Sequence, residues 1–213
     1  MLSEGVGKTQ KHILRAAQDD SPRELVLASG GKDTVVTLEL LREAGRPFDC
    51  MLLNPTKAAL AVVAEAGKDN KGRHPIIVRR TIDAKLLELN QQGYLNGHTP
   101  FSALLAFLAT AVAALFGHGR VIVSNERSAE EPGVEYLGHP INPQYSKTFE
   151  FEGKFRDYAA KYLPVSSAPA GHIEYVSLLR PLYELQIAER FARYPQYFQH
   201  FRSCNRGQAD NSW

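Results

Sequence analysis

Residues 25–41 read LVLASGGKDTVVTLELL: an apolar run, a short polar break, and a second apolar pattern that begins at once. Such a break is typical of a strand-to-helix turn. The two adjacent glycines allow backbone conformations closed to other residues and leave no side chain in the way of a ligand. Lys32 adds a positive charge suited to phosphate, while Asp33 suits either Mg²⁺ or a simple helix cap. Taken alone, the residues of Ser29–Thr34 leave two interpretations open, a turn or a cradle for a phosphate chain.

The rest of the chain alternates between strand-like and helix-like segments. Five β-rich runs begin at Glu24, Phe48, Pro75, Arg120 and Ile173. Helical patterns cover 33–45, 57–67, 82–92, 100–117, 149–162 and 181–193. The strand runs are almost continuously apolar, as in a parallel sheet with helices on both faces. The sequence therefore predicts an α/β fold with a parallel, doubly wound, Rossmann-like sheet.

Composition excludes several classes of protein. The chain has 213 residues with 25 basic and 23 acidic side chains, a formal net charge of +2. This balance does not favour nucleic acid or an anionic membrane as the main partner. Cys50 and Cys204 are the only cysteines, which excludes a disulfide framework and favours a reducing, cytoplasmic compartment. The apolar stretch 101–116 is short for a membrane span of about 20 residues and predicts a helix buried inside the domain.

Ligands of such sheets bind beyond the carboxyl ends of the strands. Polar clusters should therefore follow strands, and two of them do: Ser29–Thr34 follows the first run and Ser124–Ser128 follows the fourth. The irregular segment from Glu126 to Ser146 is long for a loop in a compact domain, and loops of this length are often functional.

The string ASGGKDT after a strand resembles the PP-loop of the ATP pyrophosphatases, whose usual form is Ser-Gly-Gly-x-Asp-Ser, with Thr34 in place of the last serine. That family cleaves ATP between its α and β phosphates. The resemblance favours the phosphate cradle over the simple turn. It implies that ATP is bound by six residues: Ser29, Gly30, Gly31, Lys32, Asp33 and Thr34.

Three further strings carry a closer resemblance: YLNGHTPFSA at 94–103, VIVSNERSAEEP at 121–132, and YVSLLRPLYELQIAERFARYPQYFQHFRSCNR at 175–206. Together with the PP-loop they resemble the ATP-dependent UDP-N-acetylmuramoyl-L-alanyl-L-glutamate epimerases of peptidoglycan precursor synthesis. The resemblance implies a nucleotide-sugar peptide as substrate and adenylation of its terminal carboxylate, which makes the adjacent proton acidic enough for a base to remove. It also implies ATP and Mg²⁺ as cofactors, with AMP and pyrophosphate as products.

The resemblance suggests roles for further residues, each with an ordinary structural alternative. Asn125, Glu126 and Ser128 follow a strand end and are candidates for ATP, metal or substrate contacts, with Glu126 as a catalytic candidate. Their alternative is a solvated loop. His98 is a candidate proton carrier because its pKa lies near neutrality, or a histidine that bonds the backbone at a helix entry. Its neighbour Asn96 is a substrate-binding candidate.

Two candidates lie in the last matching string. Arg180 follows the fifth run and suits a substrate carboxylate or a UDP phosphate, or a surface ion pair. Cys204 suits a proton donor or base, or a small buried apolar residue. The metal candidate is Asp33.

The resemblance spans about Glu24 to Arg206, which predicts a domain at 24–206 between an extension at 1–23 and a tail at 207–213. The family's sequences continue with a cysteine-containing segment, so we expect this chain to be truncated. Whether the chain is catalytically active without that segment stays open. Two alternatives also stay open: another PP-loop adenylating enzyme that modifies tRNA, and an inactive nucleotide-binding remnant of the epimerase family.

Overall fold

The computed structural model describes residues 23–68, 74–94, 101–131 and 133–203. Its central sheet has five strands: β1 (Glu24–Leu27), β2 (Phe48–Leu53), β3 (Ile76–Val78), β4 (Arg120–Val123) and β7 (Glu174–Ser177). The described α-helices are α2 (Lys32–Glu43), α3 (Lys57–Ala66), α4 (Ala84–Gln91), α5 (Phe101–Phe116), α6 (Phe149–Tyr162) and α7 (Glu184–Phe191). Three short 3-10 helices complete the list: η1 (Arg127–Glu130), η2 (Tyr145–Lys147) and η3 (Pro195–Tyr197).

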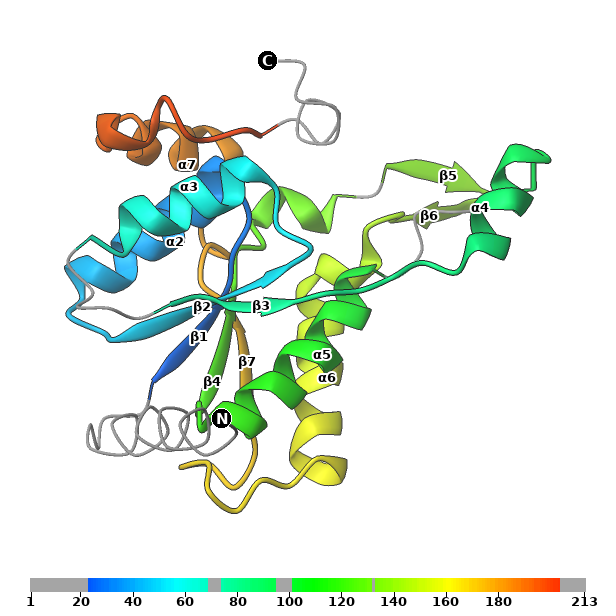
Figure 1. The fold of residues 1–213 in the computed structure, drawn as a ribbon. Helices are drawn as coiled ribbons and strands as arrows, with labels where there is room; N and C mark the ends of the chain where they lie inside the picture. Colours follow the sequence, from blue (N-terminus) through cyan, green and yellow to red (C-terminus); the bar gives the residue numbers. More distant parts are fainter. Residues whose placement is uncertain (1–22, 69–73, 95–100, 132, 204–213) are drawn as a thin grey trace, which may run out of the picture.

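The strands run in the order β3-β2-β1-β4-β7 and every neighbouring pair is parallel (Figure 1). Successive side chains of a strand enter opposite faces of the sheet. In β1, Leu25 packs into one apolar cluster and Val26 into the other, and both are fully buried. Because each central strand is buried on both faces, it needs an unbroken apolar run, which explains why these strands were readable in the sequence.

Helices cover both faces of the sheet. One cluster joins α2, α3 and α7 to the sheet, and the other joins α5 and α6 to its opposite face (Figure 1). The predicted α/β fold with a parallel, doubly wound sheet is confirmed. The helix bounds differ from the predicted ones by three residues or fewer at each end, as fraying and caps commonly allow.

The long apolar helix α5 is only half buried, so the prediction of a helix enclosed by the domain was wrong. Ala106, Ala109 and Ala113 face the sheet and are fully buried. Leu104 and Leu115 on the remaining surface are 46% and 80% exposed. The face of α5 that packs on the sheet is the one with small side chains at helical spacing, and the leucines on its other face stay exposed. In the part of the chain that the structure describes, no helix has the length and apolar character of a membrane span.

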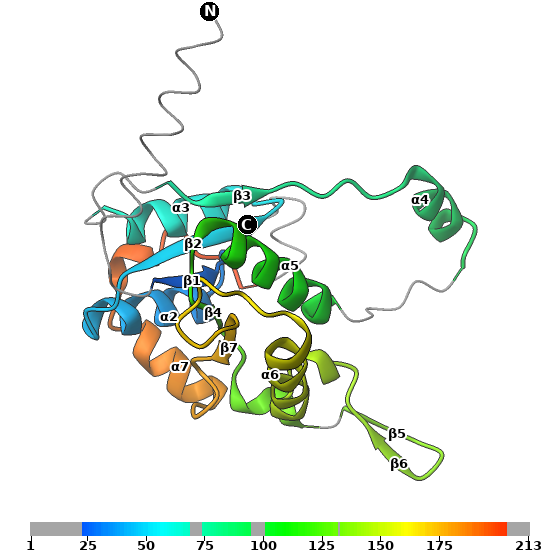
Figure 2. The same ribbon diagram turned by 90° about the horizontal axis from the view of Figure 1, so that it is seen from below.

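The segment expected to be an irregular loop contains a hairpin, β5 (Val134–Tyr136) and β6 (His139–Ile141). Leu137 and Gly138 connect the two strands with φ of 52° and 74°, the left-handed pair that a two-residue hairpin turn requires. All residues of both strands are exposed, and the hairpin projects from the body of the molecule (Figure 2). The sequence signal was weak because neither strand packs on a core.

Candidate functional site

The candidate site lies where the chain leaves β1 and β4, two neighbouring strands in the centre of the sheet. The helix after β1 covers one face, and α6, which follows β4, covers the other. Because the chain leaves these two strands toward opposite faces of the sheet, a crevice opens at their carboxyl ends. This is the usual place for a ligand in this class of fold. Both predicted polar clusters follow these strands, and a hydrogen bond of 2.9 Å between Thr37 Oγ1 on α2 and Ser124 Oγ links the helix after the first cluster to the second.

Hydroxyl groups brace the turn after β1. The backbone N–H of Ser29 donates to Thr34 Oγ1 at 3.0 Å, and the two side-chain oxygens lie 2.9 Å apart. The N–H of Gly31 lies 3.4 Å from Ser29 Oγ. Thr34 is 2% exposed, so this hydroxyl fixes the turn from inside. A threonine serves this purpose as well as the serine of the usual PP-loop.

The two glycines have different reasons to be glycine. Both avoid the left-handed region, so the expectation of a backbone closed to other residues was wrong. A Cβ on Gly30 would lie 2.9 Å from the backbone N of Ala59, so packing against α3 excludes a side chain. The described atoms nearest to a Cβ on Gly31 would be Ser29 Oγ, Arg202 O and Ser203 Oγ, at 3.7 to 3.9 Å. Gly31 thus leaves a space of about the size of a methyl group beside these oxygen atoms.

The first turn of α2 has the features of an anion site. Gly31 is its N-cap and provides no side-chain hydrogen bond, whereas Thr56 caps α3 and Thr148 caps α6 through their hydroxyls. Uncapped amides at a helix start attract anions. Lys32 Nζ lies beside this turn, 2.7 Å from Asp33 Oδ1 and 2.8 Å from Glu184 Oε1. Burial lowers the pKa of Lys32, but its hydrogen bonds to these two carboxylates outweigh burial and raise it.

Glu184 was not recognised in the sequence. It is the first residue of α7, where a glutamate is usually explained by the helix dipole alone. The loops after β4 and β7 are joined at this point, since the N–H of Arg127 donates to Leu182 O at 3.0 Å and its guanidinium lies 5.0 Å from the ring of Tyr183. The only signal that the sequence offered was the position of Glu184 shortly after a strand end.

Glu126 lies near the same charges. Partial burial, followed by the negative charges of Glu184 and Asp33, raises the pKa of Glu126. The structure therefore brings together Lys32, Asp33, Glu126 and the unpredicted Glu184 from three different loops. A carboxylate with a raised pKa in a crevice is a candidate for proton transfer.

Arg180 bridges several elements. Nη1 donates to Glu126 O at 3.1 Å and to Glu130 Oε1 at 2.7 Å, and Nη2 donates to Lys147 O at 2.7 Å and Glu152 Oε2 at 3.2 Å. Its Nε has no hydrogen-bond partner among the described residues. These contacts give Arg180 a structural task, and its predicted contact with substrate stays a prediction.

The remaining candidates are placed as follows. Asn125 Nδ2 donates to Ser177 Oγ at 3.2 Å, and Ser128 Oγ lies 3.5 Å from Glu126 Oε2, both beside the crevice. Asn96, His98 and Cys204 lie outside the described residues. Among the described residues no group of three or more histidine, cysteine and acidic side chains is arranged to hold a metal ion.

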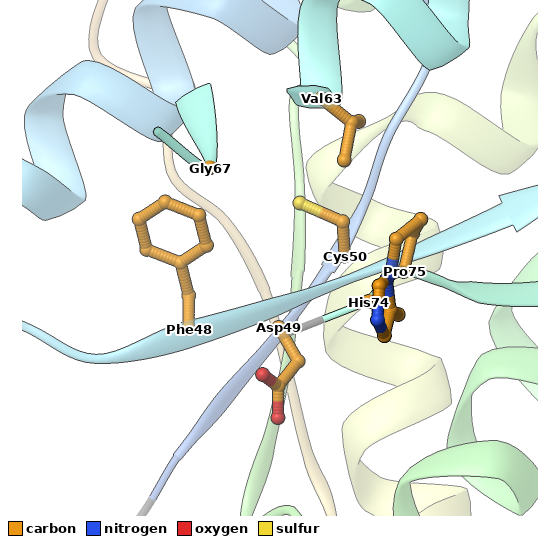
Figure 3. A pocket seen from close by; sticks show the side chains of 7 residues that line it. All are labelled: Phe48, Asp49, Cys50, Val63, Gly67, His74 and Pro75. Carbon is orange, nitrogen blue, oxygen red and sulfur yellow. The ribbon is translucent and has the colours of Figure 1, made fainter. Parts of the chain in front are cut away.

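Two cavities lie at the amino ends of the strands, away from the crevice. One of about 20 Å³ is lined by residues that include Phe48, Cys50 and Val63 (Figure 3). It has room for no more than a water molecule. Burial, and then the charge of Asp49, raise the pKa of Cys50 to about 12, so this thiol is inert at neutral pH. The other cavity, of about 250 Å³, lies among Arg46, Arg120 and neighbouring groups at the strand starts.

Residues 3–178 match the model of the MurL N-terminal domain. The chain belongs to this family. The match covers the PP-loop and the loop after β4. It ends just after β7, before Arg180 and Glu184, so the candidate site extends past the matched region.

Curated relatives of this MurL N-terminal domain carry one name. A protein of a Micromonospora species and one of Salinispora tropica are each 40% identical, over 183 and 186 residues. A protein of Xanthomonas oryzae is 36% identical over 187 residues. All three are called UDP-N-acetyl-alpha-D-muramoyl-L-alanyl-L-glutamate epimerase. The matches cover 85 to 87% of this chain but only 38% of the length of each relative.

Solved structures are more distant. A predicted tRNA methyltransferase subunit from Methanocaldococcus jannaschii has a TM-score of 0.43 at 12% identity, over 81% of this chain and 75% of its own. The NH3-dependent NAD synthetase of Campylobacter jejuni has a TM-score of 0.33 at 18% identity, over 87% and 89%. At these scores the similarities add nothing to the strand order described above.

Proposed function

We propose that this chain forms the ATP-binding part of an enzyme that epimerises the terminal L-glutamate of UDP-N-acetylmuramoyl-L-alanyl-L-glutamate. One observation carries the proposal: the SGGKDT turn stands at the switch point of the sheet in a chain of the MurL N-terminal domain family. The names of the relatives favour this activity over the tRNA-modifying alternative. The chain spans 38% of their length, so the proposal assigns it ATP binding and a share of the catalytic groups.

The chemistry explains why ATP is needed. The α-proton of a glutamate is poorly acidic because the adjacent carboxylate is already negative. Transfer of AMP to that carboxylate gives a mixed anhydride whose carbonyl stabilises the carbanion, and pyrophosphate leaves. A base then removes the proton, reprotonation from the opposite face inverts the centre, and hydrolysis releases AMP. Glu126 is the described side chain best suited to accept or donate a proton, and His98 and Cys204 remain candidates.

The residues of the turn fit a phosphate chain. Gly31 carries no side chain that would block a phosphate approaching the turn, and Lys32 supplies a countercharge. Ser29, Gly30 and Thr34 shape the turn, and the amides at the start of α2 point to the same place. Mg²⁺ usually binds one or two carboxylates together with substrate phosphates, and Asp33 suits the protein's share of that coordination.

The test has two stages. ATP binding is measured first by calorimetry with Mg²⁺, for the wild type, Lys32→Ala and the exposed control Lys154→Ala. The amine of Lys154 contacts Glu150 on α6 and Tyr145 in η2. Loss of a charged hydrogen-bond donor should weaken binding by about 10- to 100-fold in Lys32→Ala only. The second stage adds the nucleotide-sugar peptide and follows AMP and the D-glutamyl product. ATP binding that is absent from the wild type, or unchanged in Lys32→Ala, would contradict the proposal.

A further inference from the structure

The chain returns to the PP-loop near its end. The segment Phe201–Ser203 lies against the turn between β1 and α2, and Ser203 is 171 residues from Lys32 in the sequence. The N–H of Arg202 donates to Gly30 O at 2.6 Å, and the N–H of Lys32 lies 3.4 Å from Ser203 Oγ. The space beside Gly31 is therefore bordered by the PP-loop on one side and by Arg202 O and Ser203 Oγ on the other.

This segment is anchored independently of that contact. The ring of Phe201 lies 4.5 Å from that of Phe191, centroid to centroid, and packs on the apolar cluster beneath α2 and α3. The N–H of Phe201 donates to Tyr197 O at 3.0 Å. Tyr197 is itself fully buried. Phe201 thus anchors the segment Phe201–Ser203, which forms a wall beside the turn.

Ser203 Oγ lies where an anion at the first amide of α2 would make contact. The N–H of Lys32 belongs to the first turn of the helix, whose N-cap Gly31 has no side chain to accept from it, and its hydrogen bond of 3.4 Å to Ser203 Oγ is long. Ser203 is exposed, and a hydroxyl can donate as well as accept. Rotation of its proton is enough to turn this oxygen from an acceptor of the amide into a donor to an anion.

We propose that Ser203 is a phosphate-binding residue of the nucleotide site, so that ATP phosphates are held between the PP-loop and the Phe201–Ser203 wall. This inference rests on the proposed function. It assigns to the site a side chain that lies beyond the matched family domain. It also explains the openness of Gly31, since a methyl group there would enter the space between the two walls.

The experiment compares wild type, Ser203→Ala, Ser203→Thr and the control Ser166→Ala, an exposed serine in the turn before β7. Affinities for ATP and for AMP are measured by calorimetry with Mg²⁺, and thermal midpoints are measured without nucleotide. We expect Ser203→Ala to weaken ATP binding by about tenfold, the loss expected for one hydrogen bond to a charged group. The affinity for AMP should change little. Ser203→Thr keeps the hydroxyl and should retain most of the affinity, and Ser166→Ala should match the wild type.

The outcomes separate this inference from the function it rests on. If the wild type binds no ATP, the proposed function fails and the inference with it. If the wild type binds ATP and Ser203→Ala binds it equally well, only the inference is overturned. Tighter ATP binding by Ser203→Ala also overturns it, because the hydroxyl would then compete with phosphate for the Lys32 amide. An equal loss for ATP and AMP would indicate a structural effect and likewise contradict a phosphate contact.

Discussion

The backbone N of Ala59 occupies the place that a side chain on Gly30 would need, since a Cβ built there lies only 2.9 Å away. The PP-loop is thus pressed against the first turn of α3. We expect Gly30→Ala to lower the free energy of unfolding by about 1–3 kcal/mol, because backbone atoms have to move apart. Urea unfolding followed by circular dichroism measures this loss.

The neighbouring glycine supplies the matched control. Gly31 has φ of −93° and ψ of 165°, which alanine adopts without strain, and its Cβ would meet only ordinary contacts. Gly31→Ala should change stability by no more than about 0.5 kcal/mol, yet weaken ATP binding, because the methyl group enters the proposed phosphate space. Equal stability losses in both variants would contradict this division of roles.

A second prediction concerns Arg180, whose guanidinium faces Glu152, a side chain only 3% exposed. Arg180→Ala removes the closest positive charge from a buried carboxylate and should cost about 3–5 kcal/mol of stability. Arg193→Ala is the control, since Arg193 pairs with exposed Glu189 on the surface of α7 and should cost less than about 1 kcal/mol. Similar unfolding midpoints for the two variants would contradict this structural role of Arg180.

Much of the fold was predictable because the central strands and helices obey local rules. Phe48–Leu53 was recognised to the residue, since burial on both faces demands an unbroken apolar run. The β5–β6 hairpin escaped because exposed strands need no such pattern. The half-exposed face of α5 escaped because composition does not say which side of a helix is covered.

The residues of the candidate site also fall into those that the sequence could predict and those that it could not. Ser29–Thr34 was recognisable as a contiguous string between a strand and a helix. Glu184 and Ser203 were not, because only the folded chain brings them to Lys32. Which residues from distant parts of the sequence lie close together depends on the strand order β1-β4-β7 and on the return of the chain after α7. No local sequence pattern predicts either of these.

A third prediction concerns pH. The pKa of Glu126 is raised by partial burial and by the charges of Glu184 and Asp33. A carboxyl group with a raised folded-state pKa favours folding while it is protonated. Its contribution is present below the unfolded value of about 4.3 and is lost as pH rises through the folded pKa. Glu126→Gln should therefore gain stability relative to the wild type between pH 4 and pH 7.

The comparison is made by urea unfolding at several pH values within that range, with Glu189→Gln as the control. Glu189 is exposed and pairs only with Arg193 among the contacts described, so its variant should keep a constant offset from the wild type. A constant offset for Glu126→Gln as well would mean that the protonation of Glu126 does not differ between the folded and unfolded states.

The last prediction concerns the contact that holds the returning chain on α2. Tyr197 is fully buried, and its hydroxyl donates to Glu39, which is 5% exposed. Burial and this hydrogen bond raise the pKa of Tyr197, so the hydroxyl keeps its proton throughout the neutral range. Tyr197→Phe removes one of the donors to this buried carboxylate, which keeps its ion pair with Arg42, and should lower stability by about 1–3 kcal/mol. Tyr162→Phe, at an exposed ring on α6, should leave stability unchanged within about 0.5 kcal/mol. Because Tyr197 ends η3 and accepts a hydrogen bond from the N–H of Phe201, the loss of its contact with Glu39 should also weaken ATP binding. Wild-type ATP affinity in a destabilised Tyr197→Phe would show that the wall keeps its position without the Glu39 bond.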